Sequence, residues 1–454
     1  MTVQVGHALN LKIDRMGMNG EGVGRLDAGQ LAFVADGLPG EEVTATVTEI
    51  RRSFVRAVAT ARQRTSPARV TPPCAVYREC GGCALQHWNY AEELAYKEDR
   101  VRQALGRIAG IEGPPVEPIR GADDPYGYRN KGQFPWGGNA SEPTLGLYQR
   151  GSHRVVPVPS CAIQDPLVNE VLAVAARAAQ KHRLAPYDPA TGTGVLRHLL
   201  VRSSRAQQAS LALLVAAHRP PANVLQDFAT DLLAAAPHLV GVGINLNPGN
   251  TNRVLGPQTL PLSGATHLFD QILDMRFRMS FTSFFQVNPR QVEVLYQLAM
   301  DGLGMVDEIW DLYAGVGTLA ALASRHARRV RAIEVHPAAI ADAQVNFREN
   351  GLTAVTIETG EAERVVARWV ASGQAVPDAV IMDPPRSGLR PEMVDALLAL
   401  APCRLVYVSC NPDSWARDVA ALSPRYQLQR VAPVDMFPRT DHVEVVSSMV
   451  LRRV

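Results

Sequence analysis

One cysteine near the carboxyl end of the sequence lies where a thiol can act on a substrate. Cys410 follows the run Leu405–Ser409, in the sequence LVYVSCNP, and the apolar, β-branched and aromatic residues of that run indicate a buried strand. Ligands of open α/β sheets bind at the carboxyl ends of the strands, so this position favours chemistry over packing. A buried structural cysteine is the alternative, because free cysteine is among the most buried residue types.

A carboxylate and a glycine-rich loop complete the residues with evident chemistry. Asp383 ends another strand-like run in MDPPRSG, where two prolines fix it as a rigid acceptor for one edge of an amide-like ring. Gly315 and Gly317, in DLYAGVGT, let the backbone approach a ligand closely. Glu334 ends the next strand and is placed to accept hydrogen bonds from ribose hydroxyls. The loop alone fits NAD and S-adenosylmethionine equally.

Cys410 and Asp383 together favour methylation at a pyrimidine carbon over hydride transfer. C5 of uracil needs activation before it takes a methyl group, and thiolate addition at C6 gives an enolate that attacks a sulfonium methyl. A base must then remove the C5 proton, and Glu444 in FPRTDHVE is the candidate. An amino-methyltransferase of adenine or glutamine is the alternative, because it uses a similar Asp-Pro-Pro strand end and needs no thiol.

Four further cysteines predict a metal centre. Cys74, Cys80 and Cys83 are spaced C-x5-C-x2-C in a glycine-containing segment, and Cys161 is the only other cysteine outside the carboxyl-terminal part. Because we expect no secretory leader, four thiolates indicate zinc or a [4Fe–4S] cluster rather than disulfides. The spacing leaves the choice of metal open, and unrelated buried cysteines are the remaining alternative.

Length and composition limit the class of protein. The 454 residues exceed one ordinary core and predict two or three domains. A hydrophobic content of 46% with 20% charged residues is typical of a soluble globular chain, and no apolar run is long enough for a membrane span. We therefore expect a cytoplasmic protein that makes no membrane contact.

Three domains are predicted from the order of strand and helix patterns. Residues 1–62 resemble a small β-barrel, residues 63–283 an α+β central domain, and residues 284–454 an α/β domain. In the last domain, strand-like and helix-like segments alternate, which predicts a doubly wound, Rossmann-like parallel sheet. Two further strands follow without a long helix between them, so the final strand is predicted to run antiparallel.

Two segments have the composition of an RNA contact. The stretch 50–78 holds seven arginines and no acid, which would make a barrel face attractive to phosphates. The stretch 128–154 interleaves cations with aromatic residues, a pattern that suits phosphate contact and base stacking. A solvated basic face and a half-buried sheet explain the two patterns equally well. The aromatic residues of the second stretch are Tyr128, Phe134, Trp136 and Tyr148.

The motifs together resemble one enzyme family. The RNA uracil-C5 methyltransferases, in particular those that modify 23S ribosomal RNA, carry motifs similar to FFQVN, DLYAGVGT, DPPRSG, YVSCNP and DMFPRTDHVE. The likeness covers nearly the whole chain. The barrel resembles a TRAM domain, an OB-like RNA-binding module, and YRNKGQF resembles part of the family's central domain.

The resemblance implies a role for each candidate residue. Cys410 would be the nucleophile and Glu444 the base in a class I methyltransferase domain, with a [4Fe–4S] cluster on the four cysteines. It also implies that the helix at 90–109 packs on the catalytic domain of a monomer acting on 23S ribosomal RNA. Transfer RNA is the alternative substrate, and a non-catalytic RNA-binding protein the alternative class. The residues implied to contact S-adenosylmethionine are Gln286, Tyr313, Gly315, Gly317, Thr318, Glu334, Glu361 and Asp383.

Overall fold

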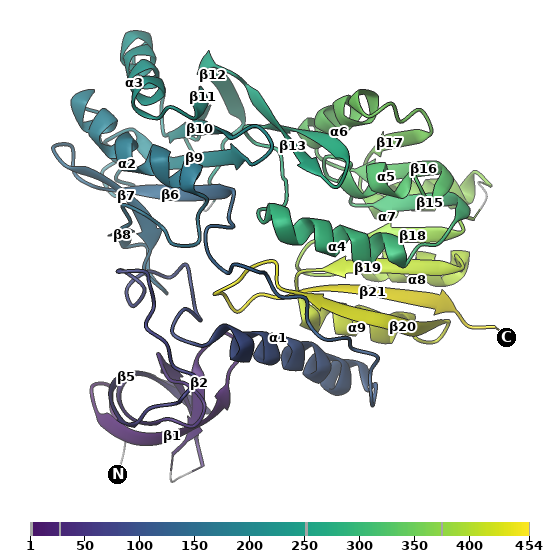
Figure 1. Ribbon diagram of the computed structural model, residues 1–454, viewed down its shortest axis with the longest axis horizontal. Coiled ribbons are helices and arrows are strands. Elements are labelled where there is room, and N and C mark those ends of the chain that lie inside the picture. The colour runs from purple at the N-terminus through teal and green to yellow at the C-terminus, as the bar shows by residue number, and fades with distance from the viewer. Residues whose placement is uncertain (1–2, 27–28, 250–252, 374–375, 454) are drawn as a thin grey trace.

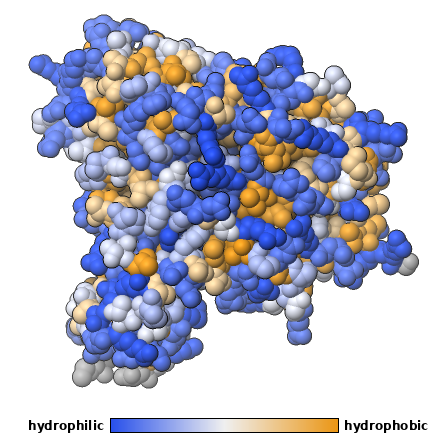
Figure 2. Space-filling model, viewed as in Figure 1, coloured by the Kyte–Doolittle hydropathy of each residue, from blue (hydrophilic) through white to orange (hydrophobic). Residues whose placement is uncertain are grey.

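The computed structural model has a small barrel, a central sheet and a carboxyl-terminal sheet flanked by helices (Figure 1). One helix runs between the barrel and the carboxyl-terminal sheet. It describes residues 3–26, 29–249, 253–373 and 376–453. No helix in these ranges is long and apolar enough to cross a bilayer. In the space-filling view the barrel protrudes at one corner, and apolar residues gather toward the middle of the face (Figure 2).

The amino-terminal strands close into a barrel. Residues on alternate positions of one strand, Val43, Ala45 and Val47, point into its core beside Leu11 and Ile13, while the threonines between them face outward. The strand order is β1-β2-β3-β5-β4. The strands are β1 (Ala8–Met16), β2 (Gly22–Arg25), β3 (Leu31–Ala35), β4 (Glu42–Ile50) and β5 (Phe54–Arg64).

One long helix, α1 (Tyr90–Ala104), joins the barrel to the carboxyl-terminal domain and continues as the π-helical turn Leu105–Ala109. Asn89 caps its start, because the side chain accepts a hydrogen bond from Ala91 N. Val101 and Leu105 are fully buried in a core that they share with the carboxyl-terminal sheet. The helix therefore packs on that domain, although the central domain follows it in sequence (Figure 1).

The central domain is a mixed sheet with two helices on one face. Its strand order is β12-β11-β10-β9-β6-β7-β8, and a two-stranded hairpin covers part of the other face, sharing a core with the carboxyl-terminal domain. The strands are β6 (Lys131–Gly138), β7 (Pro143–Tyr148), β8 (Val155–Pro157), β9 (Leu196–Ser204), β10 (Ala209–Ala216), β11 (Leu239–Leu246) and β12 (Gln258–Gly264). The helices are α2 (Pro166–Lys181) and α3 (Ala222–Ala235), and the hairpin is β13 (His267–Ile272) with β14 (Met275–Ser280).

The carboxyl-terminal domain is a doubly wound sheet of order β17-β16-β15-β18-β19-β21-β20, with one core on each face. The final strand lies between β19 and β20 and is antiparallel to both. The predicted α/β fold and the reversed final strand are confirmed. The strands are β15 (Val306–Leu312), β16 (Ala327–Glu334), β17 (Val355–Thr359), β18 (Ala379–Met382), β19 (Arg404–Ser409), β20 (Tyr426–Val434) and β21 (Glu444–Leu451). The helices are α4 (Pro289–Asp301), α5 (Thr318–Ala323), α6 (Pro337–Glu349), α7 (Ala362–Ala371), α8 (Pro391–Leu400) and α9 (Pro412–Leu422).

Candidate active site

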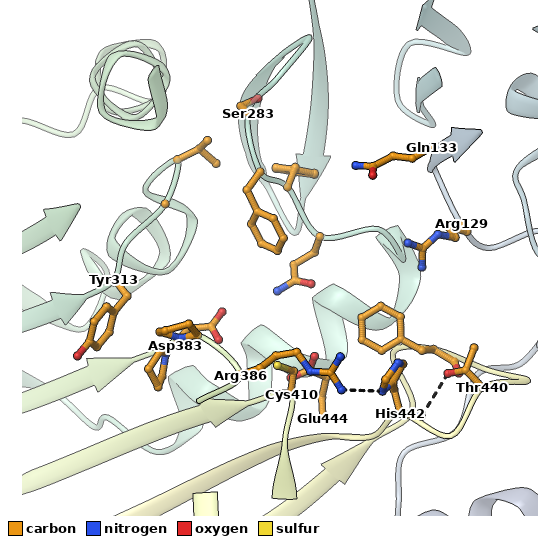
Figure 3. Close-up of a pocket in the computed structure, with 18 of the residues that line it drawn as sticks. Arg129, Gln133, Ser283, Tyr313, Asp383, Arg386, Cys410, Thr440, His442 and Glu444 are labelled. Carbon is orange, nitrogen blue, oxygen red and sulfur yellow. Dashed lines mark hydrogen bonds between the residues drawn. The ribbon is translucent and has the colours of Figure 1, made fainter. Parts of the chain in front are cut away.

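The carboxyl ends of neighbouring strands bring the chemically active residues to one edge of the large sheet. In parallel register Met382 pairs with Leu312 on one side and with Tyr407 on the other, so Asp383 and Cys410 leave adjacent strands at the same edge. Figure 3 shows Cys410 beside Arg386, Glu444 and His442, with Asp383 close by. This edge is where ligands of doubly wound sheets bind.

The pairing of β19 with β21 brings Glu444 level with Cys410. Ser409 pairs with Val445 in antiparallel register, so the next residue of one strand, Cys410, comes opposite the preceding residue of the other, Glu444. The Glu444 side chain is buried and the Cys410 side chain is half-buried. The thiol and the carboxyl group therefore meet at the end of two bonded strands.

A cavity of about 1430 Å³ lies over this edge, between the catalytic sheet, the central sheet and the cysteine segment. It extends from the glycine-rich loop at one end to the four cysteines at the other. Every residue that the sequence suggested for catalysis, cofactor binding or metal binding lines it except Gly317. Those residues are Gln286, Tyr313, Gly315, Thr318, Glu334, Glu361, Asp383, Cys410, Glu444, Cys74, Cys80, Cys83 and Cys161.

The two glycines of the loop have different structural reasons to be glycine. Both have positive φ, +56° at Gly315 and +78° at Gly317, a conformation that disfavours side chains. A Cβ at Gly315 would meet no atom within 4 Å, whereas a Cβ at Gly317 would lie 2.6 Å from the Phe347 ring. Gly315 thus leaves room beside the cavity for a ligand, and Gly317 permits the packing of α6 against the loop.

Glu334 is held rigidly at the end of β16. One carboxylate oxygen accepts hydrogen bonds from Val335 N and His336 N, and the other accepts from Gly315 N, each at 2.8 Å. Each oxygen of a carboxylate has lone pairs for more than one donor. The fixed orientation on the cavity wall therefore suits a diol ligand such as a ribose.

The other residues predicted to contact the cofactor differ in their hydrogen-bond and ion-pair partners. Tyr313 has φ +69° and donates its hydroxyl to Glu363 at 3.0 Å, while the Thr318 hydroxyl lies 3.3 Å from the Tyr296 hydroxyl. Gln286 is buried at the cavity wall. Glu361 forms ion pairs with two exposed arginines, so its carboxylate is already engaged. These partners are Arg364 and Arg390.

The site is rich in acids whose burial favours their protonated forms. Burial raises the pKa of Asp383 to about 7 and the pKa of Glu444 well above its ordinary value. Burial, then Glu444 and Asp383, raise the pKa of the Cys410 thiol to about 12, and Arg386 opposes this shift. A positive charge beside a carboxyl group favours its ionised form, so the sulfonium of S-adenosylmethionine would lower the raised pKa values of these acids.

Arg386, which lies in the site, and Asp311, which lies buried behind it, were not singled out from the sequence. Arg386 lines the cavity and lies 3.3 Å from Nδ1 of His442, and its guanidinium acts against the raised pKa of both Cys410 and Glu444. Asp311 is fully buried, and neither carboxylate oxygen makes a hydrogen bond of normal geometry within the described residues. Both belong to motifs already recognised, DPPRSG and DLYAGVGT, so their place in a motif was the available signal.

The four upstream cysteines line one end of the cavity and are not in disulfides. Burial raises the pKa of Cys83 to about 12, and the other three thiols contribute to the shift, so they lie near one another. However, the described residues contain no group of three or more His, Cys, Asp or Glu side chains placed to hold a metal ion. The set of four thiols fits the donor chemistry of a metal centre, but the side chains are not drawn together as the sequence predicted.

The two candidate RNA segments are only partly available for RNA. Tyr128, Phe134 and Trp136 are buried, which favours the half-buried sheet over base stacking for these three rings; Tyr148 alone of the four is exposed. In the barrel segment, several arginines form ion pairs with barrel acids instead of a free basic face. These are Arg51, Arg56, Arg62, Arg69 and Arg78, with partners Glu21, Asp36, Glu41 and Glu49.

Comparison with known proteins agrees with this site. A family model described as tRNA (Uracil-5-)-methyltransferase matches residues 268–454, and a TRAM domain model matches residues 2–60. An uncharacterized RNA methyltransferase of Listeria innocua is 36% identical over 98% of both chains. One of Bacillus cereus is also 36% identical, over 99% of this chain and 98% of its own.

A solved structure matches over almost the full length. It is the Pyrococcus abyssi tRNA (uracil-54, C5)-methyltransferase in complex with S-adenosyl-L-homocysteine. The TM-score is 0.77 at 25% sequence identity, and the match covers 97% of this chain and 99% of that chain. The chain belongs to the S-adenosylmethionine-dependent RNA uracil-C5 methyltransferase family and carries an amino-terminal TRAM domain.

Proposed function

We propose that this protein methylates C5 of a uridine in 23S ribosomal RNA through a covalent bond between Cys410 and C6 of the base. The observation that carries this proposal is the register that sets Cys410 opposite Glu444, with Asp383 at the end of the adjacent strand. A nucleophile, a base and a fixed acceptor are the three groups that carbon methylation of uracil requires.

The reaction proceeds in steps that these side chains divide among themselves. S-adenosylmethionine supplies a methyl group bound to a positively charged sulfur. The Cys410 thiolate adds to C6, and the electron pair of the C5–C6 double bond moves to C5 and O4, which makes C5 nucleophilic. After C5 has taken the methyl group, the Glu444 carboxylate removes the C5 proton, the double bond reforms and the thiolate leaves.

Asp383 and Arg386 have supporting roles in this scheme. The Asp383 carboxylate accepts a hydrogen bond from N3–H of uracil and holds the ring edge-on to the sheet edge. The Arg386 guanidinium opposes the rise in the pKa of the Cys410 thiol, and so favours the thiolate. Flipping the uridine out of its RNA loop brings the base to these residues.

The covalent step is tested by stopping the reaction before the proton leaves. Glu444→Gln keeps the size of the side chain but removes the base, so addition and methyl transfer go forward and the adduct persists. We expect a denaturation-resistant RNA–protein species on a gel, carrying the methyl label. Cys410→Ala in the same background removes the species. Glu444→Gln protein that forms no adduct, or turns over normally, would contradict the assignment.

The second candidate substrate is transfer RNA, which the likeness to the Pyrococcus abyssi enzyme favours. That likeness spans 97% of this chain, barrel included, so a barrel does not distinguish the two substrates. Purified protein incubated with 23S ribosomal RNA and with transfer RNA, both lacking 5-methyluridine, decides between them. Methylation of the ribosomal RNA alone supports the proposal, and methylation of the transfer RNA alone overturns its substrate.

The four cysteines are proposed to bind a [4Fe–4S] cluster, with zinc as the alternative. The support is that four thiols, the donor set that such a cluster uses, line the same cavity. Protein purified without oxygen should contain about four iron atoms per chain and absorb broadly near roughly 400 nm. A colourless protein that contains zinc would contradict the cluster. The Cys161→Ser variant should lose the absorbance.

A further inference from the structure

The segment that carries Glu444 is held from outside the catalytic domain. This base loop, residues 435–444, runs from β20 to β21 and ends at Glu444. Three of its backbone carbonyls are bonded within the domain, because Gln291 donates to Asp435 O, Asn288 to Met436 O and Thr440 to Phe437 O. Further contacts to the loop come from α1, from the start of the central domain and from the residues that follow Cys83.

A fully buried ion cluster fixes the start of the loop to α1. The Lys97 ammonium lies 2.7 Å from a carboxylate oxygen of Glu93 and 2.7 Å from one of Asp435, and all three side chains are 0% exposed. Arg439 adds a second cation, 3.3 Å from the other oxygen of Glu93. Two cations thus balance two carboxylates, and α1 supplies one of each sign.

The same residues also hold the backbone of the loop. Lys97 donates to Phe437 O at 3.2 Å, and Glu93 accepts from Arg439 N at 2.7 Å. Arg439 has φ +68°, an unusual conformation for a bulky residue, which these bonds maintain. Tyr128 donates its hydroxyl to Pro438 O at 3.0 Å, so the central domain adds a third contact.

The cysteine segment joins this arrangement directly. Arg439 O accepts hydrogen bonds from Ala84 N and Leu85 N, both at 3.0 Å, and these two residues follow Cys83 in the sequence. Trp88 O accepts a bond from the Arg439 guanidinium at 3.0 Å. One residue of the base loop is thereby bonded to both ends of the short segment between Cys83 and α1.

We propose that Lys97 is a positioning residue, which through Asp435 and Phe437 sets the place of Glu444 beside Cys410. The inference rests on the proposed role of Glu444 as the base. Removal of one partner from a buried charge cluster leaves an uncompensated charge, which the local structure relieves by moving. Glu444 is the first residue of β21 and borders the loop, so movement of the loop would displace its carboxyl group from the C5 proton, while Cys410 and the cofactor residues lie outside the loop and keep their places.

The expected signature belongs to one step of the reaction. Lys97→Met keeps the length of the side chain and removes the charge, and we expect kcat to fall about tenfold to a hundredfold with KM little changed. Because addition and methyl transfer precede proton removal, the adduct with Cys410 should accumulate as it does in Glu444→Gln. A variant that is only less stable would lose every activity in proportion to its folded fraction and would accumulate no adduct.

A double variant separates stability from positioning. Lys97→Met with Asp435→Asn removes one charge of each sign and leaves the pair of Glu93 and Arg439. We expect it to regain much of the thermal stability that Lys97→Met loses, yet to keep the low kcat, because the bonds from Lys97 to Asp435 and Phe437 are still absent. Recovery of kcat together with stability would overturn the positioning role.

Two controls, Lys181→Met and Glu444→Gln, show whether a negative result counts against the positioning role or against the proposed function. Lys181→Met makes the same substitution at an exposed lysine of α2 that pairs with Asp231, and it should match the wild type in kcat and adduct level. If Glu444→Gln traps the adduct and Lys97→Met does not, the inference fails and the proposed function stands. If Glu444→Gln traps none, the proposed function fails, and the kcat of the single and double variants still tests whether Lys97 positions the loop.

Discussion

Cys410 and Glu444 lie opposite each other across two bonded strands, because Ser409 of β19 pairs with Val445 of β21. Both side chains therefore stand at strand ends rather than on a mobile loop tip. The ladder brings the two backbones level at the sheet edge, and in the proposed mechanism these residues act as nucleophile and base on adjacent carbons of one ring. The variants below examine each part of this arrangement.

Cys410→Ala is expected to abolish methyl transfer, with a fall in kcat of roughly 10⁴-fold or more, because no other group activates C5. S-adenosylmethionine affinity should stay nearly unchanged, since the cofactor residues lie on other strands. Transfer of labelled methyl groups to RNA measures the first, and calorimetry the second. Retained methylation would remove the thiol from the mechanism and favour an amino-methyltransferase.

Glu334→Ala is expected to weaken S-adenosylmethionine binding by roughly ten- to a hundredfold. Loss of hydrogen bonds from a charged acceptor to ribose hydroxyls corresponds to about 1.5–3 kcal/mol. Titration calorimetry gives the dissociation constant. Glu349→Ala is the matched control, because Glu349 is an exposed carboxylate at the end of α6. The Glu349→Ala protein should bind the cofactor normally. Equal affinities in both variants would place the ribose elsewhere.

Alanine at the two loop glycines is expected to act in two different ways. Gly315→Ala meets no neighbouring atom, so its free energy of unfolding should fall by only about 1–2 kcal/mol, from backbone conformation alone, while cofactor binding is lost. Gly317→Ala adds the collision with Phe347 and should destabilise by roughly 2–5 kcal/mol. Chemical denaturation and cofactor titration distinguish them. The reverse order of stabilities would contradict the assignment.

The value of kcat/KM is expected to rise between about pH 6 and about pH 9. The pKa of Asp383 is raised to about 7 and that of the Cys410 thiol to about 12, and burial also raises the pKa of Glu444. Each group must act in its deprotonated form, so raising the pH through this window increases the active fraction. Steady-state rates, with thermal stability checked at each pH, test this. A profile that falls across the window contradicts it.

Much of the fold followed from local patterns. The run 405–409 is apolar on both faces, as a strand covered on both sides must be, and the alternation with helices set the parallel order. The helix α2 was not predicted, although Asp165 caps it and Pro166 begins it. Those two residues are a start signal that also occurs in turns, so the signal alone does not assign a helix.

Some residues of the site could be predicted from a local sequence signal, whereas others depend on neighbours that are distant in the sequence. Cys410 and Asp383 could be found because each ends its own strand. The effect of the Arg386 charge on the pKa of its neighbours and the burial of Asp311 both depend on the folded structure, so the sequence alone does not reveal them. The aromatic residues of 128–154 misled because the same alternation places a ring on a base or in a core. Phe134, for example, lies fully buried under the central helices.

Insertion of β21 between β19 and β20 has a consequence for synthesis. A ribosome that has produced β20 but not β21 has made Cys410, Asp383 and Arg386 but not Glu444. Until the last strand emerges and enters the gap between β19 and β20, the growing polypeptide lacks the carboxyl group that the proposed mechanism uses to release a captured base. Enzymatic competence is thereby tied to completion of translation through this strand.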